Sequence, residues 1–439
     1  MNKKYRLILL ALLVVTLFSG CNIRTVEDMY CLPKRSQAYQ ALQSEIDKAL
    51  GGQEYLAPLS GENRQTVQSA DLDGDGVSEY LVFARGGADN PLKICIFAGD
   101  KKGYRLVDTI ESTGNAFEQV EYVQMDGQKG LEIVVGNQVS SDVVRNVSVY
   151  TMKNGEIQQL LSTNYSKFVC CDLDTNGNSD LLVLRPGETT GDKGLAQLYT
   201  FQGEVDRTAE INMSGPSDTI KRIMVGKLND QVPAVYVASS ADAASVVTDI
   251  YAKVDGTFTN VALSNSSGTS VQTLRNYYVF SDDIDNDGVL ELPDLITMKM
   301  PDQLHTTADH YLIRWYAMNS MGAKIKKQYT YHNFVGGWYV RLDQGIAPRM
   351  YVLQQGNSYE FYIWDEKQES SEKLISIYVL TGQKREEQAA IDNRFVLHRT
   401  ETTVYAASLE VSSANYNITK DNFIGSFHMI TLDWKTGET

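Results

Sequence analysis

The stretch "SADLDGDGVSEYLVF", residues 69–83, concentrates negative charge in a short turn and then becomes apolar. Asp71, Asp73, Asp75 and Glu79 fall within nine positions, with two glycines between them. Carboxylates confined to a tight turn repel one another unless a cation or other donors offset their charge. Tyr, Leu, Val and Phe follow at once, which is typical of a buried β-strand. The stretch therefore predicts an acidic loop that leads into a strand.

The same pattern returns twice, with oxygen-bearing side chains at positions 1, 3, 5 and 9 and glycine at position 6. The second copy is "DLDTNGNSD", residues 172–180, and the third is "DIDNDGVLE", residues 283–291. Weaker copies without the full acid set lie between and after them. Taking position 9 as the anchor, the seven copies are placed at Glu79, Glu132, Asp180, Pro233, Glu291, Pro348 and Thr402.

The anchors are spaced at a nearly constant interval of about four strands' length, and Val-, Ile-, Tyr- and Phe-rich runs alternate with turns from residue 53 onward. Such a repeat predicts an all-β fold in which small sheets stack around an axis, a seven-bladed β-propeller over residues 53–439. Too few strands follow Thr402 for a complete unit, so strands from residues 53–70 are expected to complete the last blade. Six or eight blades remain alternatives.

The loop positions have a chemical interpretation. A hard cation such as Ca²⁺ takes six to eight oxygen ligands, which the side chains at positions 1, 3, 5 and 9 and a backbone carbonyl at position 7 can supply. An EF-hand is excluded because position 12 lacks glutamate, and the flanking segments are strands rather than helices. The alternative is that Asp and Gly serve only as turn formers.

These nine-residue loops resemble the FG-GAP/VCBS repeats of integrin α-subunit propellers and bacterial surface proteins. The resemblance covers about residues 53–439 and implies structural calcium. The ligands that it implies are Asp71, Asp73, Asp75, Glu79, Asp172, Asp174, Asn176, Asp180, Asp283, Asp285, Asp287 and Glu291. Asn176 lowers the charge of the second loop, so weaker affinity is expected there. The whole chain is similar to bacterial repeat lipoproteins, which implies no particular activity.

The N-terminus has the features of a secretory signal over residues 1–20. Lys3, Lys4 and Arg6 precede an apolar run that ends in "LFSGC". This resembles a bacterial lipobox, with Cys21 as the lipidated residue, although Phe18 stands where leucine is usual. The alternative is an ordinary cleaved signal peptide. Lipidation predicts a protein anchored to the outer face of the cell membrane, with residues 21–52 as a tether and short helix.

The helix is expected within residues 35–52. Ser36 can cap it, an apolar stripe runs along one face, and Gly51 and Gly52 end it. The stripe consists of Ala38, Leu42, Ile46, Ala49 and Leu50.

Composition narrows the possible partners. The formal net charge of −15 argues against nucleic acid as a ligand. The cysteines form no CxxC pair, which argues against zinc, and those in strand-like runs are expected to be free thiols.

No catalytic or cofactor-binding motif is recognisable. Trp338 follows two glycines that could expose its ring to a ligand, but core packing is the preferred interpretation.

Three functions fit these features. The first is a lipid-anchored, cell-surface propeller that binds a protein or glycan partner, with calcium stabilising the scaffold. The second is a cell-envelope polysaccharide lyase or hydrolase that uses the mouth of the propeller channel. The third is an envelope assembly factor without a small ligand. Since no catalytic residue is nominated, the sequence favours a role in binding.

Overall fold

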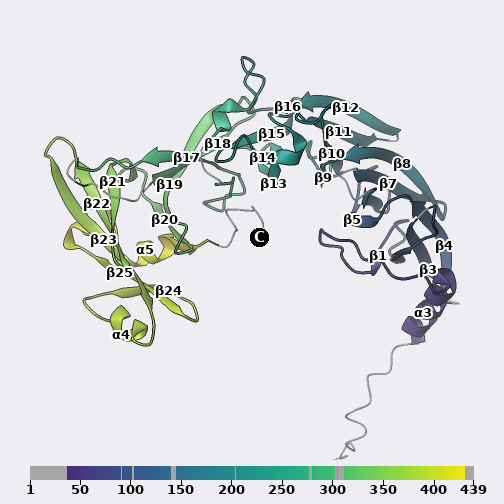
Figure 1. Ribbon diagram of the computed structural model, residues 1–439, viewed down its shortest axis with the longest axis horizontal. Helices are drawn as coiled ribbons and strands as arrows, with labels where there is room; N and C mark the ends of the chain where they lie inside the picture. The colour runs from purple at the N-terminus through teal and green to yellow at the C-terminus, as the bar shows by residue number, and fades with distance from the viewer. Residues whose placement is uncertain are drawn as a thin grey trace, which may run out of the picture. The chain divides into compact units, whose positions relative to one another are not determined.

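The computed structural model describes residues 37–89, 91–100, 103–139, 145–202, 204–275, 279–301, 304 and 311–430. The predicted signal, the lipobox and Cys21 lie outside these residues. The described part is an all-β structure of six antiparallel sheets, each with four or five strands, plus a few short helices (Figure 1). The all-β prediction is therefore confirmed.

The chain divides into two compact units. Among the described residues, the first unit contains 37–57, 65–70 and 76–113, and the second contains 58–64, 71–75 and the rest from 114 onward. The first unit holds α3 (Gln37–Leu50) and the first sheet, with β1 (Val67–Ala70), β2 (Glu79–Arg85), β3 (Leu92–Asp100) and β4 (Gly103–Ser112).

Helix α3 confirms the predicted amphipathic helix. Leu42, Ile46 and Leu50 lie one turn apart and are buried against the first sheet, where Val82 and Phe97 belong to the same apolar cluster. The helix ends at two glycines with φ of 57° and 92°, which a residue with a β-carbon rarely adopts.

The second unit contains the other five sheets, which follow one another along the chain. The second sheet has β5 (Ala116–Val123), β6 (Glu132–Gln138), β7 (Arg145–Lys153) and β8 (Glu156–Tyr165). The third has β9 (Lys167–Cys171), β10 (Asp180–Arg185), β11 (Leu195–Gln202) and β12 (Glu204–Asn212). The fourth has β13 (Ile220–Lys227), β14 (Pro233–Ser240), β15 (Val246–Val254) and β16 (Thr257–Asn260).

The last two sheets have five strands each. The fifth has β17 (Leu292–Thr297), β18 (Tyr311–Met318), β19 (Lys324–Asn333), β20 (Trp338–Leu342) and β26 (Phe427–Met429). The sixth has, in spatial order, β21 (Met350–Gln355), β22 (Ser358–Asp365), β23 (Ser370–Thr381), β25 (Thr403–Leu409) and β24 (Phe395–Arg399). The short helices are α4 (Arg385–Ala389), α5 (Lys420–Ser426) and the 3-10 turns Ser217–Thr219, Val271–Thr273, Ala347–Arg349 and Val411–Tyr416.

Successive sheets of the second unit share apolar cores, which explains why their central strands are apolar on both faces. In β10, Leu181 and Val183 belong to a cluster with the second sheet, whereas Leu182 and Leu184 belong to a cluster with the fourth. All four side chains are fully buried. A strand that alternates between two cores reads as a continuous hydrophobic run, as the sequence does here.

Two details of the strand pairing differ from the predicted repeat. The copy anchored at Thr402 forms no sheet of its own, because β25 instead pairs with β23 and β24 in the sixth sheet. The part of residues 53–70 that forms a strand, β1, pairs with β2 in the first sheet rather than with the last. The seven-blade count is thus not confirmed, since six sheets are present in the described residues.

The fifth sheet is instead completed by the C-terminal strand. β26 pairs with β20 in antiparallel register, Val340 opposite Phe427 and Trp338 opposite Met429. Helix α5 lies next to β20 as well, so yellow C-terminal and green ribbon meet in this sheet (Figure 1). Trp338 is fully buried here, as core packing requires.

Candidate metal centre

The three acidic loops have the same backbone conformation. Position 4 has a positive φ in every loop, whether it is Gly74, Thr175 or Asn286, and the glycine at position 6 has φ between 82° and 88°. The aspartate at position 1 accepts hydrogen bonds from backbone N–H groups three to five residues ahead: Gly74 in the first loop, Asn176 and Gly177 in the second, and Asp287 and Gly288 in the third.

Two further positions attach each loop to its sheet. Position 2 is a buried apolar side chain, and position 9 is a buried acid at the start of the next strand or one residue before it. In the third loop, the N–H of Ile284 at position 2 donates to Oε2 of Glu291 at 3.1 Å. The loop is thereby folded back onto the acid, so that positions 1, 3 and 9 can face one space.

The third loop brings Asp283, Asp285 and Glu291 together. One oxygen from each carboxylate lies within 4.8 Å of the others. Glu291 is fully buried, yet its Oε1 has no hydrogen-bond donor, and neither has Oδ1 of Asp285. A buried carboxylate oxygen without a donor is costly, and a cation is a partner that would remove the cost.

The pKa values of the carboxyl groups in the third loop also favour a bound cation. Burial is the main cause that raises the pKa of Glu291, to about 8, and the neighbouring Asp285 and Asp287 raise it further. The pKa of Asp285 is also raised, by burial first and then by Asp287. Carboxyl groups with raised pKa values in the metal-free protein indicate uncompensated negative charge, which a bound cation would offset.

Asp287, at position 5, is not part of this group of three. Its Oδ2 accepts from Nζ of Lys327 on β19 at 2.7 Å. The lysine thus pairs directly with position 5 only. Its charge also opposes the raised pKa values of Asp285 and Glu291, but burial and the neighbouring acids outweigh it.

The first loop has an equivalent set. Asp71, Asp73 and Glu79 also place one oxygen each within 4.8 Å of the others, and Glu79 is buried. Asp75, the remaining predicted ligand, is not in the set. The described residues therefore contain two acidic clusters that could bind a metal ion.

The second loop is arranged differently. Nζ of Lys253, from β15 of the fourth sheet, lies 2.6 Å from Oδ2 of Asp174 at position 3. As in the third loop, the side-chain oxygens at positions 1 and 5, here of Asp172 and Asn176, accept from backbone N–H groups of the same loop. Of the predicted ligands Asp172, Asp174, Asn176 and Asp180, no three carboxylates form a metal-type cluster within the described chain.

Asp180, at position 9 of the second loop, has the raised pKa of a buried acid. Burial raises its pKa to about 6, and Lys253 opposes this increase as the strongest favourable charge. Lys253 thus supplies a positive charge next to Asp174 and Asp180, although the buried Oδ2 of Asp180 has no hydrogen-bond partner. The spacing of acids in the sequence could not reveal this lysine.

The second sheet contains an acid that sequence reasoning treated only as an anchor. Glu132 occupies position 9 of the loop before β6 and is buried. Its Oε2 accepts from the N–H of Met125 at 2.7 Å, and its Oε1 accepts from the hydroxyl of Thr151 at 3.1 Å. A hydroxyl group thus replaces the cation here, and a threonine on a neighbouring strand is the signal that could have suggested it.

Other residues singled out from the sequence have structural roles. Cys95, Cys170 and Cys171 are free thiols, as expected. His332, which the sequence analysis did not single out, is buried and stacks on Tyr339, with ring centroids 4.8 Å apart. Among the described residues, no helix has the length and apolar character that crossing a membrane requires.

Comparison with known proteins identifies no family for this chain. No family model matches it, and no curated protein matches its sequence. Solved structures with some likeness include the rhamnogalacturonan lyase YesW, at 12% identity and a TM-score of 0.30 over 69% of this chain and 73% of that one. The rhamnogalacturonan lyase PL11 of Bacillus licheniformis reaches 12% identity and a TM-score of 0.31 over 73% and 74%.

A protein from Lactobacillus plantarum is similar at 10% identity, with a TM-score of 0.27 over 72% of this chain and 86% of that one. Scores at this level carry no conclusion about the fold or the activity of this chain.

Proposed function

We propose that this protein is a calcium-stabilised, propeller-type binding module, held at the outer face of the cell membrane by a lipid on Cys21. The observation that carries the metal site is the fully buried Glu291, whose Oε1 has no donor and lies beside the carboxylates of Asp283 and Asp285. The repeated, mutually packed sheets support the scaffold role.

Calcium is the cation that this donor set favours. The converging side chains are all carboxylates, without histidine or cysteine, so a hard cation is preferred over zinc or copper. The loop backbone is irregular and carries a further carbonyl at position 7, which suits the variable coordination of Ca²⁺ better than the strict octahedron of Mg²⁺. Asp283, Asp285 and Glu291 would hold one ion, and Asp71, Asp73 and Glu79 a second.

The metal is proposed to be structural. Each cluster joins a loop to the first residues of the following strand, so a bound cation would stabilise the folded loop by the free energy of its binding. The partner that such a rigid module would recognise is a protein or a glycan. No observation in the described residues favours the lyase, hydrolase or assembly-factor alternatives over this one.

The test is calcium titration of the purified protein by isothermal calorimetry, with elemental analysis and melting curves in EDTA. Two ions per chain and a lower melting temperature in EDTA are expected. Asp285→Asn should remove one of the ions, whereas Asp89→Asn, at an exposed aspartate outside the loops, should remove none. Protein that contains no metal and melts identically with and without EDTA would refute the calcium proposal.

A further inference from the structure

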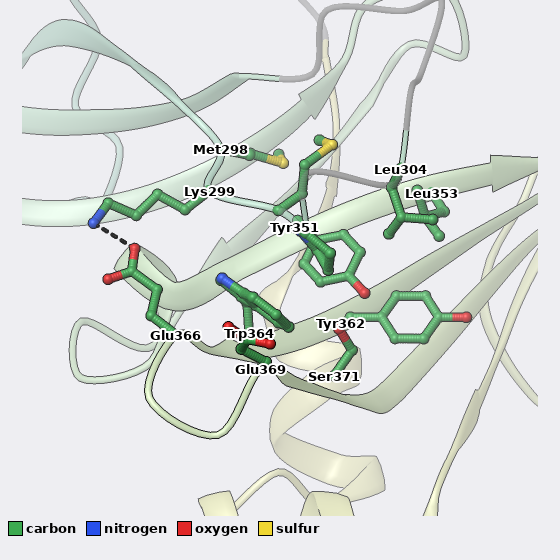
Figure 2. A pocket seen from close by; sticks show the side chains of 12 residues that line it. Met298, Lys299, Leu304, Tyr351, Leu353, Tyr362, Trp364, Glu366, Glu369 and Ser371 are labelled. Carbon is green, nitrogen blue, oxygen red and sulfur yellow. Dashed lines mark hydrogen bonds and ion pairs between the residues drawn. The ribbon is translucent and has the colours of Figure 1, made fainter.

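A groove of about 970 Å³ lies beside the sixth sheet. One wall comes from residues 298–301, which follow β17, and the floor comes from β21, β22 and β23 (Figure 2). Its volume is at the upper end of that of small-ligand pockets, so it can hold several linked rings.

Two half-buried aromatic side chains form the floor, and a third, Tyr351, is buried beside them. Tyr362 and Trp364 are two residues apart on β22 and therefore project from the same face of the sheet, both half-buried. Tyr351 lies opposite Tyr362 on β21, and their rings stack with centroids 5.1 Å apart and an angle of 9°. Figure 2 shows Trp364 between the Tyr351–Tyr362 stack and the acidic rim. The rings are held by the sheet, so little side-chain entropy would be lost when a ligand packs on them.

The rim is polar and acidic. Nζ of Lys299 lies 2.8 Å from Oε1 of Glu366, and both side chains are largely exposed. Glu369 is exposed in the turn before β23, where its φ of 48° is unusual for a residue with a β-carbon. These groups place one ammonium and two carboxylates beside the aromatic floor, with a negative total charge.

We infer that this groove binds an uncharged oligosaccharide. A sugar ring offers an apolar C–H face that packs on Tyr362 and Trp364, and hydroxyl groups at its edge that can pair with carboxylates and lysine. The acidic rim disfavours uronic-acid polymers, because like charges would be brought together.

A peptide fits less well than a sugar. Peptides that bind sheets add to an open backbone edge, whereas β22, which carries Tyr362 and Trp364, is paired on both sides by β21 and β23. The strand that carries the two half-buried rings therefore offers side chains rather than free backbone groups, whereas the neighbouring β21 lies at an edge of the sheet. The inference rests on the proposed function, whose glycan alternative it selects and places at a named site.

The test uses the full chain in calcium, with cellohexaose, xylohexaose and mannohexaose as neutral probes and an oligogalacturonate as the acidic one. Binding is followed by isothermal calorimetry. At least one neutral hexasaccharide should bind, and Trp364→Ala should weaken it by about tenfold or more. Trp364→Phe keeps a ring and should lose less, and Glu369→Gln tests the rim without touching the floor.

Tyr39→Ala is the matched control, because it removes an exposed aromatic ring from α3 rather than from the groove. It should bind the sugar as the parent protein does. Absence of binding by every neutral probe, preference for the oligogalacturonate, or equal binding by folded Trp364→Ala would each overturn the inference. Calcium titration of the same samples distinguishes the sugar-binding proposal from the calcium proposal. Sugar binding can fail while two ions still bind, and ion binding can fail while the sugar still binds.

Discussion

The loops 172–180 and 283–291 share a backbone conformation but offset their negative charge in different ways. In the second loop, Lys253 reaches from the neighbouring sheet and pairs with Asp174 at position 3. In the third loop, Lys327 pairs with Asp287 at position 5, which leaves Asp283, Asp285 and Glu291 facing one another. The position that the lysine engages, rather than the number of acids, distinguishes a loop with its own ammonium partner from a loop that can accept a metal ion.

The largest expected effect is the loss of calcium-dependent stability when the third loop loses one of its carboxylates. Asp285→Asn should abolish most of the calcium-dependent stabilisation of its loop, which amounts to about 3 kcal/mol when free calcium is 100-fold above the dissociation constant. Asp174→Asn should leave the calcium-dependent shift of the melting temperature nearly unchanged. Scanning calorimetry with and without calcium measures both, and equal losses in the two variants would contradict the distinction between the loops.

The second prediction is that removing its lysine should let the second loop bind an ion, as the third loop is proposed to do. Lys253→Met removes the ammonium group and leaves Asp174 and Asp180 without their main favourable charge, so the metal-free protein should lose about 1–3 kcal/mol of unfolding free energy. Calcium should then restore part of the loss, and one additional ion should bind per chain. Urea unfolding and calorimetric titration measure these changes.

Lys327→Met is the matched control for that conversion. Asp287, its partner, is 39% exposed, compared with 23% for Asp174. The loss of this more solvated pair should be smaller, and the number of bound ions should not increase. An unchanged ion count in Lys253→Met would show that ammonium and calcium do not compete for the second loop.

The third prediction concerns pH. The pKa of Glu291 is raised to about 8 in the metal-free protein, above its ordinary value near 4.5. The folded state therefore holds this proton more tightly than the unfolded chain. Its stabilising contribution is present below about pH 4.5 and is lost as pH rises through 8, at up to about 1.4 kcal/mol per pH unit. For Asp180, whose pKa is about 6, the loss should end near pH 6.

Glu291→Gln should flatten this loss between pH 6 and 8, as should saturating calcium, which displaces the proton. Metal-free unfolding curves at several pH values provide the measurement. A parent protein and a Glu291→Gln variant with parallel pH profiles in this range would argue against a protonated Glu291.

The smallest expected effect tests the loop that uses a hydroxyl group. Thr151→Val removes the donor to Oε1 of the buried Glu132 and should cost about 1–2 kcal/mol in urea unfolding. Thr257→Val, at an exposed position of β16, is the control and should change stability little. Equal effects of the two substitutions would mean that the hydroxyl of Thr151 does not stabilise Glu132.

The features that sequence reasoning predicted correctly depend on local signals. The helix α3 follows from its apolar stripe and terminal glycines, and the anchors Glu79, Glu132, Asp180 and Pro233 each begin a strand. Turn residues and side-chain alternation act over a few positions, so one sequence is sufficient to find them.

The features that were missed depend on residues distant in the chain. Which sheet receives β25 or β26 is decided by the edges left open by β23 and β20, and the sequence does not encode this locally. The same holds for the second loop, since Lys253 lies 79 residues from Asp174. Acid spacing predicted a loop followed by a strand in all three copies, but it could not predict the partner of each carboxylate.

The pairing of β26 with β20 has a consequence for how the chain matures. β20 ends at Leu342 and β26 begins at Phe427, so about 85 residues must be synthesised before the fifth sheet can be completed. For the exported chain proposed above, the edge of β20 stays without this partner until those residues have also crossed the membrane. During that interval an unpaired strand edge that carries Trp338 and Val340 is open to wrong partners. The rate at which this stretch is exported, and any chaperone that protects the exposed edge, would then influence how much of the newly made protein reaches its native form.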